Sequence, residues 1–381
     1  MRECIKKCLS LTLVICLLIA TFAPTKTLKA ETDIDSSAKA MVVIDANSKR
    51  VLLSKDKDME LAMASTTKIM TALIALENTK DLDEIFKIDN RAVGIEGTSI
   101  YLEKDEEMSM LDLLYGLMLA SGNDSACAIA YRVGNGELSN FVELMNKKCE
   151  ELNLKHTHFD NPHGLDSKTH YTSAYDLAII TSKAMENETF RKIVSTKIKQ
   201  LPSKNNSRFV RNKHKLLGVL DGCEGVKTGF TDNALRCCVT STIRDGFRTI
   251  CVVLNCPNMF EESMRLTEKA YNEYTYTKVY LEKNIVGKMN IINGVKDSVE
   301  LYTNNACFYP LKKNENEKDK LKIEINYKEE IDAPIKKDEE IGDVKVYLDK
   351  DLIFSEKIYT MEEVRKIEIS DKLKEIVENW Y

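Results

Sequence analysis

Hydrophobic and polar positions change their period several times along the chain. Within residues 40–53, a short apolar run stands on either side of an Asn47-centred turn, which predicts two short strands joined as a hairpin. Apolar residues at helical spacing follow Ser65, and an apolar stretch at 111–120 ends at Ser121, beyond which a further helix is expected from Asp124. Strands are then expected near 225–229, 237–241 and 249–254, followed by a helix at about 261–276. Helices in the middle of the chain, flanked by strands from both ends, predict an α/β (α+β) domain with a sheet and a helical subdomain.

The last hundred residues have a different texture. Apolar residues alternate with charged ones at 321–327 and again at 344–348. This alternation predicts a small all-β domain, a sandwich at about 283–360. Residues 361–381 are expected to form an amphipathic helix whose polar face mixes acidic and basic side chains. Docking on the β domain and contact with a membrane surface therefore both remain open for this helix.

The first thirty residues have the layout of a secretory signal peptide. Basic residues come first, an apolar run occupies residues 9–23, and Pro24 and the small residue Ala30 follow. A retained transmembrane anchor is the alternative, but the run is short for a hydrocarbon core that needs about twenty apolar residues. The sequence therefore predicts export and removal of residues 1–30. The remainder exceeds the roughly 250–300 residues at which single cores stop growing, so two domains are expected.

Charge and cysteine content narrow the classes of partner and cofactor. The formal net charge is −5 and the signal segment is itself basic, so the exported protein is more acidic still. This charge balance argues against nucleic acid as a partner, because phosphate binding needs a basic face. Of eleven cysteines, three lie in the signal segment and eight lack the paired spacing of a zinc site. These eight are expected to be buried thiols, with disulfides as the alternative, and no metal or cofactor is predicted.

Among candidate catalytic residues, Ser65 and Lys68 stand at the start of the expected apolar helix. A serine hydroxyl is a weak nucleophile at neutral pH and needs a base beside it. A lysine three residues later on a helix faces the same side, and burial lowers the pKa of a lysine enough for it to accept a proton. The same spacing recurs from Ser36 and from Ser54, in charged stretches that are expected to be exposed. A plain helix N-cap is the alternative role for Ser65.

Two further polar clusters have the residue types that a substrate site needs. Ser121-Gly122-Asn123 falls at the expected corner between two buried helices, where polar groups need partners. Lys227-Thr228-Gly229 falls on an expected strand, where glycine would let a substrate backbone approach and the Lys/Thr pair would bind a carboxylate. Simple turn residues, in the first cluster, and an exposed strand lysine, in the second, are the alternatives.

In order along the chain, these three elements resemble the S-x-x-K, S-x-N and K-T-G set of penicillin-binding proteins and serine β-lactamases. The stretches 159–165 and 170–177, with the β domain and terminal helix, resemble the low-molecular-mass serine D-alanyl-D-alanine carboxypeptidases in particular. The resemblance implies a penicillin-recognising transpeptidase/β-lactamase-like domain at 31–278, with an antiparallel sheet and a helical subdomain. One departure is Ala234-Leu235, where the family commonly has Ala-Gly.

The activity implied by this resemblance is removal of the terminal D-alanine from peptidoglycan stem pentapeptides through an acyl-enzyme. β-Lactam antibiotics would inhibit the enzyme by acylating it. Such an enzyme would serve cell wall biogenesis, acting outside the cytoplasm at the cell wall or at the outer face of the cytoplasmic membrane. The terminal helix would then offer a peripheral membrane contact.

The resemblance also implies a role for each matching residue. Ser65 would be the nucleophile, Lys68 its proton acceptor and Ser121 the relay to the leaving amine. The substrate-binding residues would be Asn123 for the peptide amide, Lys227, Thr228 and Gly229 for the terminal carboxylate and the adjoining backbone, and Phe230, whose N–H would share the oxyanion hole with that of Ser65.

Two other functions are compatible with the same motifs. A β-lactamase would have to hydrolyse its penicilloyl ester quickly, yet no glutamate is identified that would prime the water, and β-lactamases generally lack the extra β domain. A wall-binding protein without catalysis would keep the fold but would not need the full set of catalytic residue types.

Overall fold

The computed structural model describes residues 34–202, 208–281 and 283–378. The predicted signal segment, 1–30, therefore lies outside the described residues. None of the described helices is long and apolar enough to span a membrane.

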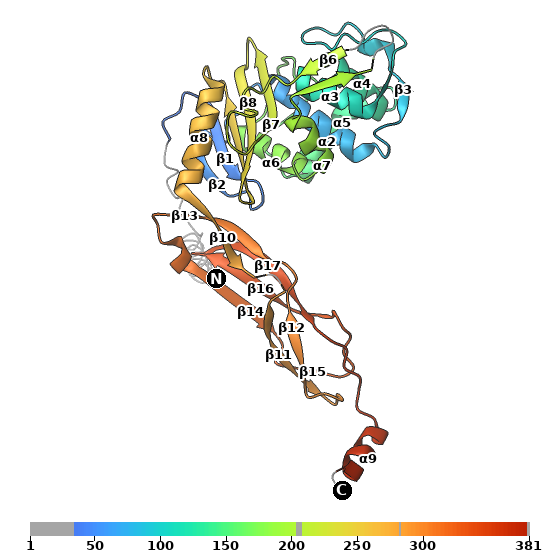
Figure 1. Cartoon of the computed structure of the whole chain (residues 1–381), viewed down its shortest axis with the longest axis vertical. Coiled ribbons are helices and arrows are strands. Elements are labelled where there is room, and N and C mark those ends of the chain that lie inside the picture. The colour runs from blue at the N-terminus through green and yellow to red at the C-terminus, as the bar shows by residue number, and fades with distance from the viewer. Residues whose placement is uncertain (1–33, 203–207, 282, 379–381) are drawn as a thin grey trace, which may run out of the picture. The chain divides into compact units, whose positions relative to one another are not determined.

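A five-stranded antiparallel sheet forms the centre of the first part of the chain (Figure 1). Its strands, in the spatial order β2-β1-β9-β8-β7, are β1 (Ala40–Asp45), β2 (Val51–Lys55), β7 (Cys223–Thr231), β8 (Leu235–Arg244) and β9 (Phe247–Leu254). The first two strands come from the N-terminal side of the helices and the other three from their C-terminal side. The predicted hairpin around Asn47 and the three later strands are thus present, with β7 at one edge of the sheet.

Both faces of this sheet are covered by helices. Successive side chains of a strand point to opposite faces, so neighbouring residues of one strand pack in different cores. In β1, Val42 and Ile44 belong to the core shared with the helical subdomain, whereas Met41 and Val43 pack with α8 (Met259–Glu273) on the other face. The sheet therefore lies between α8 and the helical subdomain (Figure 1).

The helical subdomain holds the remaining helices of this part. They are η2 (Ala64–Thr67), α2 (Lys68–Asn78), η3 (Asn90–Ala92), α3 (Met110–Tyr115), η4 (Gly116–Ala120), α4 (Asn123–Val133), α5 (Leu138–Glu151), α6 (Ala174–Ala184) and α7 (Glu188–Ser195). Two small hairpins accompany them, β3 (Ile85–Lys87) with β4 (Glu107–Ser109) and β5 (Ile198–Leu201) with β6 (Arg208–Arg211). The helix expected to open at Ser65 begins instead as the 3₁₀ turn η2, and α2 starts at Lys68.

The C-terminal part is all-β with a separate core. Strand β10 (Tyr274–Tyr280) pairs with β13 (Cys307–Lys312), and a six-stranded sheet has the order β14-β16-β17-β12-β11-β15. Its strands are β11 (Ile285–Ile292), β12 (Ser298–Tyr302), β14 (Leu321–Tyr327), β15 (Glu330–Asp332), β16 (Glu340–Leu348) and β17 (Asp351–Thr360), and the 3₁₀ turn η5 (Glu317–Lys320) precedes β14. Helix α9 (Ile369–Glu378) follows.

Two predicted boundaries are wrong in this region. The helix expected over 361–381 begins only at Ile369. The helix expected at 261–276 ends at Glu273, and residues 274–276 belong to β10. Backbone pairing of Tyr274 with Lys312 and of Tyr276 with Pro310 replaces the last helical turn. The limits 278 and 283 drawn between the two domains remain a prediction.

The eight cysteines from Cys127 to Cys307 are all free thiols, and all but Cys223 are buried. Their prediction as buried small side chains is therefore confirmed, and burial raises the pKa of the Cys237 thiol to about 12. Among the described residues, no group of three or more histidine, cysteine or acidic side chains is placed to hold a metal ion.

Candidate active site

The first of the three motifs lies on the turn from η2 into α2. Ser65 is half-buried on η2, and Lys68, the first residue of α2, is completely buried. The Lys68 Nζ atom lies 3.0 Å from Ser65 Oγ. The spacing of three residues thus places amine and hydroxyl in direct contact, as the helical pattern predicts.

Lys68 has two further partners besides the serine. Its Nζ donates to Asn123 Oδ1 at 2.7 Å and to the carbonyl oxygen of His163 at 2.5 Å. Burial, and then the positive charge of Lys227, hold the pKa of Lys68 well below its ordinary value. A neutral amine has two N–H groups and one lone pair, so donation to Asn123 and His163 leaves the lone pair facing the Ser65 hydroxyl. This arrangement can accept a proton from Ser65.

The second motif forms the corner between η4 and α4. Ser121 is 4% exposed and has a φ of +68°, a left-handed backbone that ends the preceding helical turn. Asn123 begins α4 and is held by two hydrogen bonds besides the one to Lys68. Its backbone N–H donates to Thr98 O at 2.7 Å, and its side-chain Nδ2 donates to Glu96 O at 2.6 Å. The amide oxygen of Asn123 is thereby aimed at Lys68, so the second motif joins the first.

The third motif lies on β7, the edge strand next to η2. A Cβ atom added at Gly229 would lie 2.9 Å from Ser65 N and 3.0 Å from Ala64 Cβ, so only glycine lets the strand approach this closely. Lys227 is 2% exposed and its Nζ donates to Thr228 O at 2.8 Å. Burial, with a smaller contribution from Lys213, lowers the pKa of Lys227 to about 7. A buried amine with a lowered pKa suits an anionic ligand, whose negative charge would favour its ammonium form.

Phe230 follows on the same strand and is 59% exposed. Lys68 therefore contacts both Ser65 and Asn123, and Gly229 packs against Ser65. Lys227, Thr228 and Phe230 lie on the same strand as Gly229.

The other two Ser-x-x-Lys segments have different environments from those expected. The expectation that Ser36 and Ser54 are exposed is wrong, because they are 8% and 4% exposed. Ser36 Oγ donates to Glu262 Oε1 at 2.5 Å, and Ser54 lies within the strand β2, where a residue three positions later does not share its face. Neither serine therefore stands in the Ser65 arrangement.

The 159–170 segment holds the turn that carries Ser65, a role that its sequence does not reveal. The His163 carbonyl is a partner of Lys68, and Thr71 Oγ1 donates to Pro162 O at 2.6 Å. A Cβ atom at Gly164 would lie 1.9 Å from Ala64 O, and Gly164 has a φ of +93°. A glycine in a polar turn is a detectable signal of such a close approach, but its partner cannot be read from the sequence.

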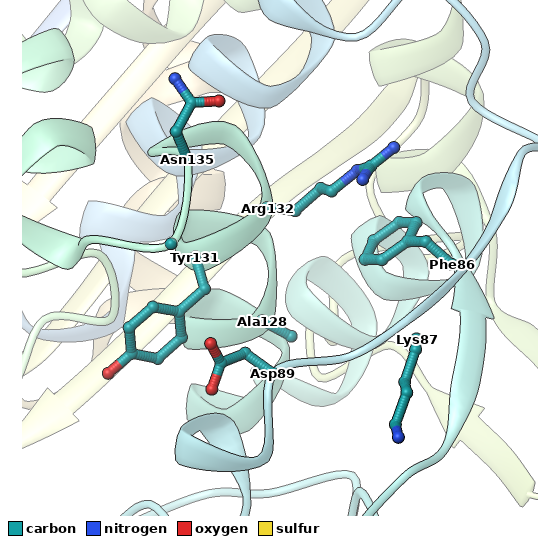
Figure 2. A pocket seen from close by; sticks show the side chains of 8 residues that line it. Phe86, Lys87, Asp89, Ala128, Tyr131, Arg132 and Asn135 are labelled. Carbon is teal, nitrogen blue, oxygen red and sulfur yellow. The ribbon is translucent and has the colours of Figure 1, made fainter.

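A pocket of about 310 Å³ lies between β3 and α4 (Figure 2). It is lined by Phe86, Lys87, Asp89, Ala128, Tyr131, Arg132, Asn135 and Gly136. The Arg132 guanidinium lies 4.7 Å from the Phe86 ring centroid and that of Arg91 lies 4.2 Å from the Tyr131 centroid, so each ring already has a cationic partner. None of the expected catalytic residues lines this pocket.

Comparison with known proteins identifies the family. The family model described as D-alanyl-D-alanine carboxypeptidase matches residues 25–258, which is more than half of the chain. The chain belongs to this family. The model described as the C-terminal domain of penicillin-binding protein 5 matches residues 274–366. The predicted fold class and carboxypeptidase activity are thereby confirmed.

Two individual relatives match most of the chain, and a third matches about two thirds of it. D-Alanyl-D-alanine carboxypeptidase DacF of Bacillus subtilis (strain 168) is 32% identical over 382 residues, covering 97% of both chains. The crystal structure of penicillin-binding protein 5 from Haemophilus influenzae superposes with a TM-score of 0.72 at 28% identity, over 88% of this chain and 99% of that one. A Streptomyces K15 DD-transpeptidase structure gives a TM-score of 0.60 at 29% identity. The match covers 63% of this chain and 100% of that one, so the transpeptidase structure has no counterpart of the rest of this chain.

Proposed function

We propose that this carboxypeptidase cleaves the terminal D-alanyl-D-alanine bond through an acyl-enzyme on Ser65, with neutral Lys68 as the base. The observation that carries the proposal is the 3.0 Å contact between Lys68 Nζ and Ser65 Oγ, made by a lysine that is completely buried. Burial supplies the low pKa that a lysine needs to act as a base near neutral pH.

In the first half of the reaction, Ser65 Oγ attacks the carbonyl carbon of the penultimate D-alanine while its proton passes to Lys68. The backbone N–H groups of Ser65 and Phe230 stabilise the oxyanion of the tetrahedral intermediate. As the intermediate collapses, the C–N bond breaks and the leaving amine takes a proton through Ser121. Free D-alanine departs, and water then hydrolyses the ester and regenerates the Ser65 hydroxyl.

Substrate binding falls to the residues around this pair. Asn123 binds the peptide amide, and Lys227 with Thr228 binds the terminal carboxylate. The negative charge of that carboxylate raises the pKa of Lys227 and so favours its ammonium form. Gly229 leaves room for the substrate backbone along β7. The arrangement selects a peptide with a free C-terminal carboxylate.

The natural substrates in this proposal are peptidoglycan stem pentapeptides, and β-lactams are inhibitors that acylate Ser65. The enzyme is exported through its N-terminal segment and acts outside the cytoplasm, at the cell wall or the outer face of the cytoplasmic membrane. Exposed apolar side chains on α9, with Ile369 at 80% and Leu373 at 59% exposure, support peripheral membrane contact by that helix.

The experiment is release of D-alanine from a Lys-D-Ala-D-Ala peptide by the purified exported chain. Wild type is expected to turn over, whereas Ser65→Ala and Lys68→Ala lose at least about 1,000-fold in kcat, as removal of a nucleophile or its base does elsewhere. Ser54→Ala, a buried serine with the same downstream lysine spacing, is the matched control and retains turnover. Undiminished release by Ser65→Ala would overturn the proposal, and steady hydrolysis of penicillin without D-alanine release would favour a β-lactamase instead.

A further inference from the structure

Ala64, the residue before the nucleophile, has an unusual backbone. Its φ is +50°, in the left-handed region that alanine rarely adopts, and it is 1% exposed. A non-glycine residue stays in this region only where the surrounding structure holds it there, and such positions cluster at functional sites. The contacts that hold Ala64 therefore bear on the geometry of Ser65.

A directed series of hydrogen bonds ends on the Ala64 carbonyl. Thr67 Oγ1 donates to Ala64 O at 2.8 Å and lies 2.8 Å from His170 Nε2. The backbone N–H of Asp160 donates to His170 Nδ1 at 3.0 Å. Since Nδ1 accepts and the threonine hydroxyl is already donating, the ring proton must reside on Nε2 and be donated to Thr67. One tautomer of His170 therefore satisfies the whole series.

The environment of His170 keeps this arrangement rigid and neutral. His170 is 3% exposed and Thr67 is fully buried, and the imidazole packs edge-on against Phe159 with ring centroids 5.7 Å apart. Burial lowers the pKa of His170 to about 4, while Asp160 opposes that shift and His158 and Lys68 add to it. The ring is therefore uncharged over the working range of pH.

The geometry of one peptide unit connects this series to the chemistry. The carbonyl of Ala64 and the N–H of Ser65 belong to the same planar trans peptide, so they point in opposite directions. Thr67 holds the oxygen on the His170 side, where Gly164 also presses against it. The N–H is thereby turned away from that side, and the Ser65 nitrogen lies against Gly229 of β7.

We propose that His170 and Thr67 are positioning residues that aim the Ser65 N–H at the oxyanion of the tetrahedral intermediate. They touch no reacting atom and act only through the Ala64 carbonyl. The inference rests on the proposed role of Ser65, and it assigns a function to the 159–170 segment that packs behind the nucleophile turn.

The first test replaces the threonine hydroxyl. Thr67→Val keeps the shape of the side chain and removes both hydrogen bonds, whereas Thr67→Ser restores them. A misaimed oxyanion donor acts in the transition state, so Thr67→Val is expected to lower kcat for D-alanine release by about 10- to 100-fold with KM nearly unchanged. Thr67→Ser should return kcat to within about threefold of wild type, since the bond is remade. Thr181→Val is the matched control, because it removes a buried hydroxyl that donates to Leu177 O within α6.

The second test distinguishes the two nitrogens of His170. In His170→Gln the side-chain amide reaches the position of Nε2 and can still donate to Thr67, whereas in His170→Asn the shorter amide reproduces only Nδ1. The glutamine variant is therefore expected to keep a higher kcat than the asparagine variant. Equal or reversed values, or a Thr67→Val enzyme with unchanged kcat or with a change in KM alone, would overturn the inference.

Ser65→Ala separates this inference from the proposed function. If Ser65→Ala still releases D-alanine, the proposed function itself fails. If Ser65→Ala is inactive while folded Thr67→Val and both His170 variants match wild type, only the positioning role fails. Thermal melting of each variant, compared with that of Thr181→Val, shows whether loss of rate exceeds that expected from loss of stability.

Discussion

Replacing Gly229 by alanine tests whether the edge strand β7 and the turn that carries Ser65 must touch. The added Cβ atom would lie 2.9 Å from Ser65 N and 3.1 Å from Met63 O. Both are backbone atoms that cannot rotate away, so strand and turn must separate by roughly half an ångström to restore ordinary contact distances. The substitution therefore moves Ser65, the proposed nucleophile, relative to β7.

The size of the effect follows from that displacement. A misplacement of about 1 Å costs about 100-fold in rate, so half of it corresponds to roughly tenfold. Overpacking of a filled interior also costs about 1–3 kcal/mol of unfolding free energy. Gly229→Ala is thus expected to be acylated by benzylpenicillin about ten times more slowly than wild type, in stopped-flow or quenched-flow measurements, while remaining folded in thermal melts.

Gly246→Ala is a suitable control. Gly246 lies in the β8–β9 turn with a φ of +80° and no atom within 4 Å of an added Cβ. Alanine there costs about 1 kcal/mol through its backbone but leaves the site alone. Equal acylation rates of Gly229→Ala and wild type would refute the packing argument, and equal slowing in both variants would attribute the effect to stability.

Three further predictions concern charge, ion pairing and backbone strain. As the proposed base, Lys68 must be neutral to accept a proton, so acylation should be lost as pH falls through its pKa. Lys227→Met removes a neighbouring positive charge and thereby raises the pKa of Lys68. The acidic limb of the pH–rate profile should therefore move to higher pH, whatever the plateau rate. Arg208→Ala breaks a pair whose partner, Glu106, is only 2% exposed, and chemical denaturation should report a loss of about 3 kcal/mol. Leu235 has a φ of +54° and is 42% exposed, so Leu235→Gly should raise the free energy of unfolding by about 1 kcal/mol; a decrease would show that its side-chain contacts outweigh the strain.

The parts of the site that the sequence predicts are those that depend on local geometry. Ser65 and Lys68 are three residues apart, and a helical turn alone suffices to bring their side chains together. The strand β1 is apolar on both faces, which is typical of a strand covered on both sides. Such features need no knowledge of distant residues.

Other features depend on partners that are remote in the chain. Helical spacing continues through Tyr276, yet pairing with β13 makes residues 274–276 a strand, and that competition is invisible in the local pattern. The left-handed Ala64 is held by Thr67 and His170, the latter 103 residues beyond Thr67. Burial of Ser36 likewise follows from its bond to Glu262, which its charged sequence neighbours do not indicate.

The most direct test of the account is the intact mass of the exported chain after mixing with benzylpenicillin, followed by peptide mapping. One penicilloyl adduct per chain is expected on the peptide that contains Ser65, present in Ser54→Ala and absent from Ser65→Ala. An adduct that persists in Ser65→Ala, or a wild-type chain that gains no mass, would contradict it.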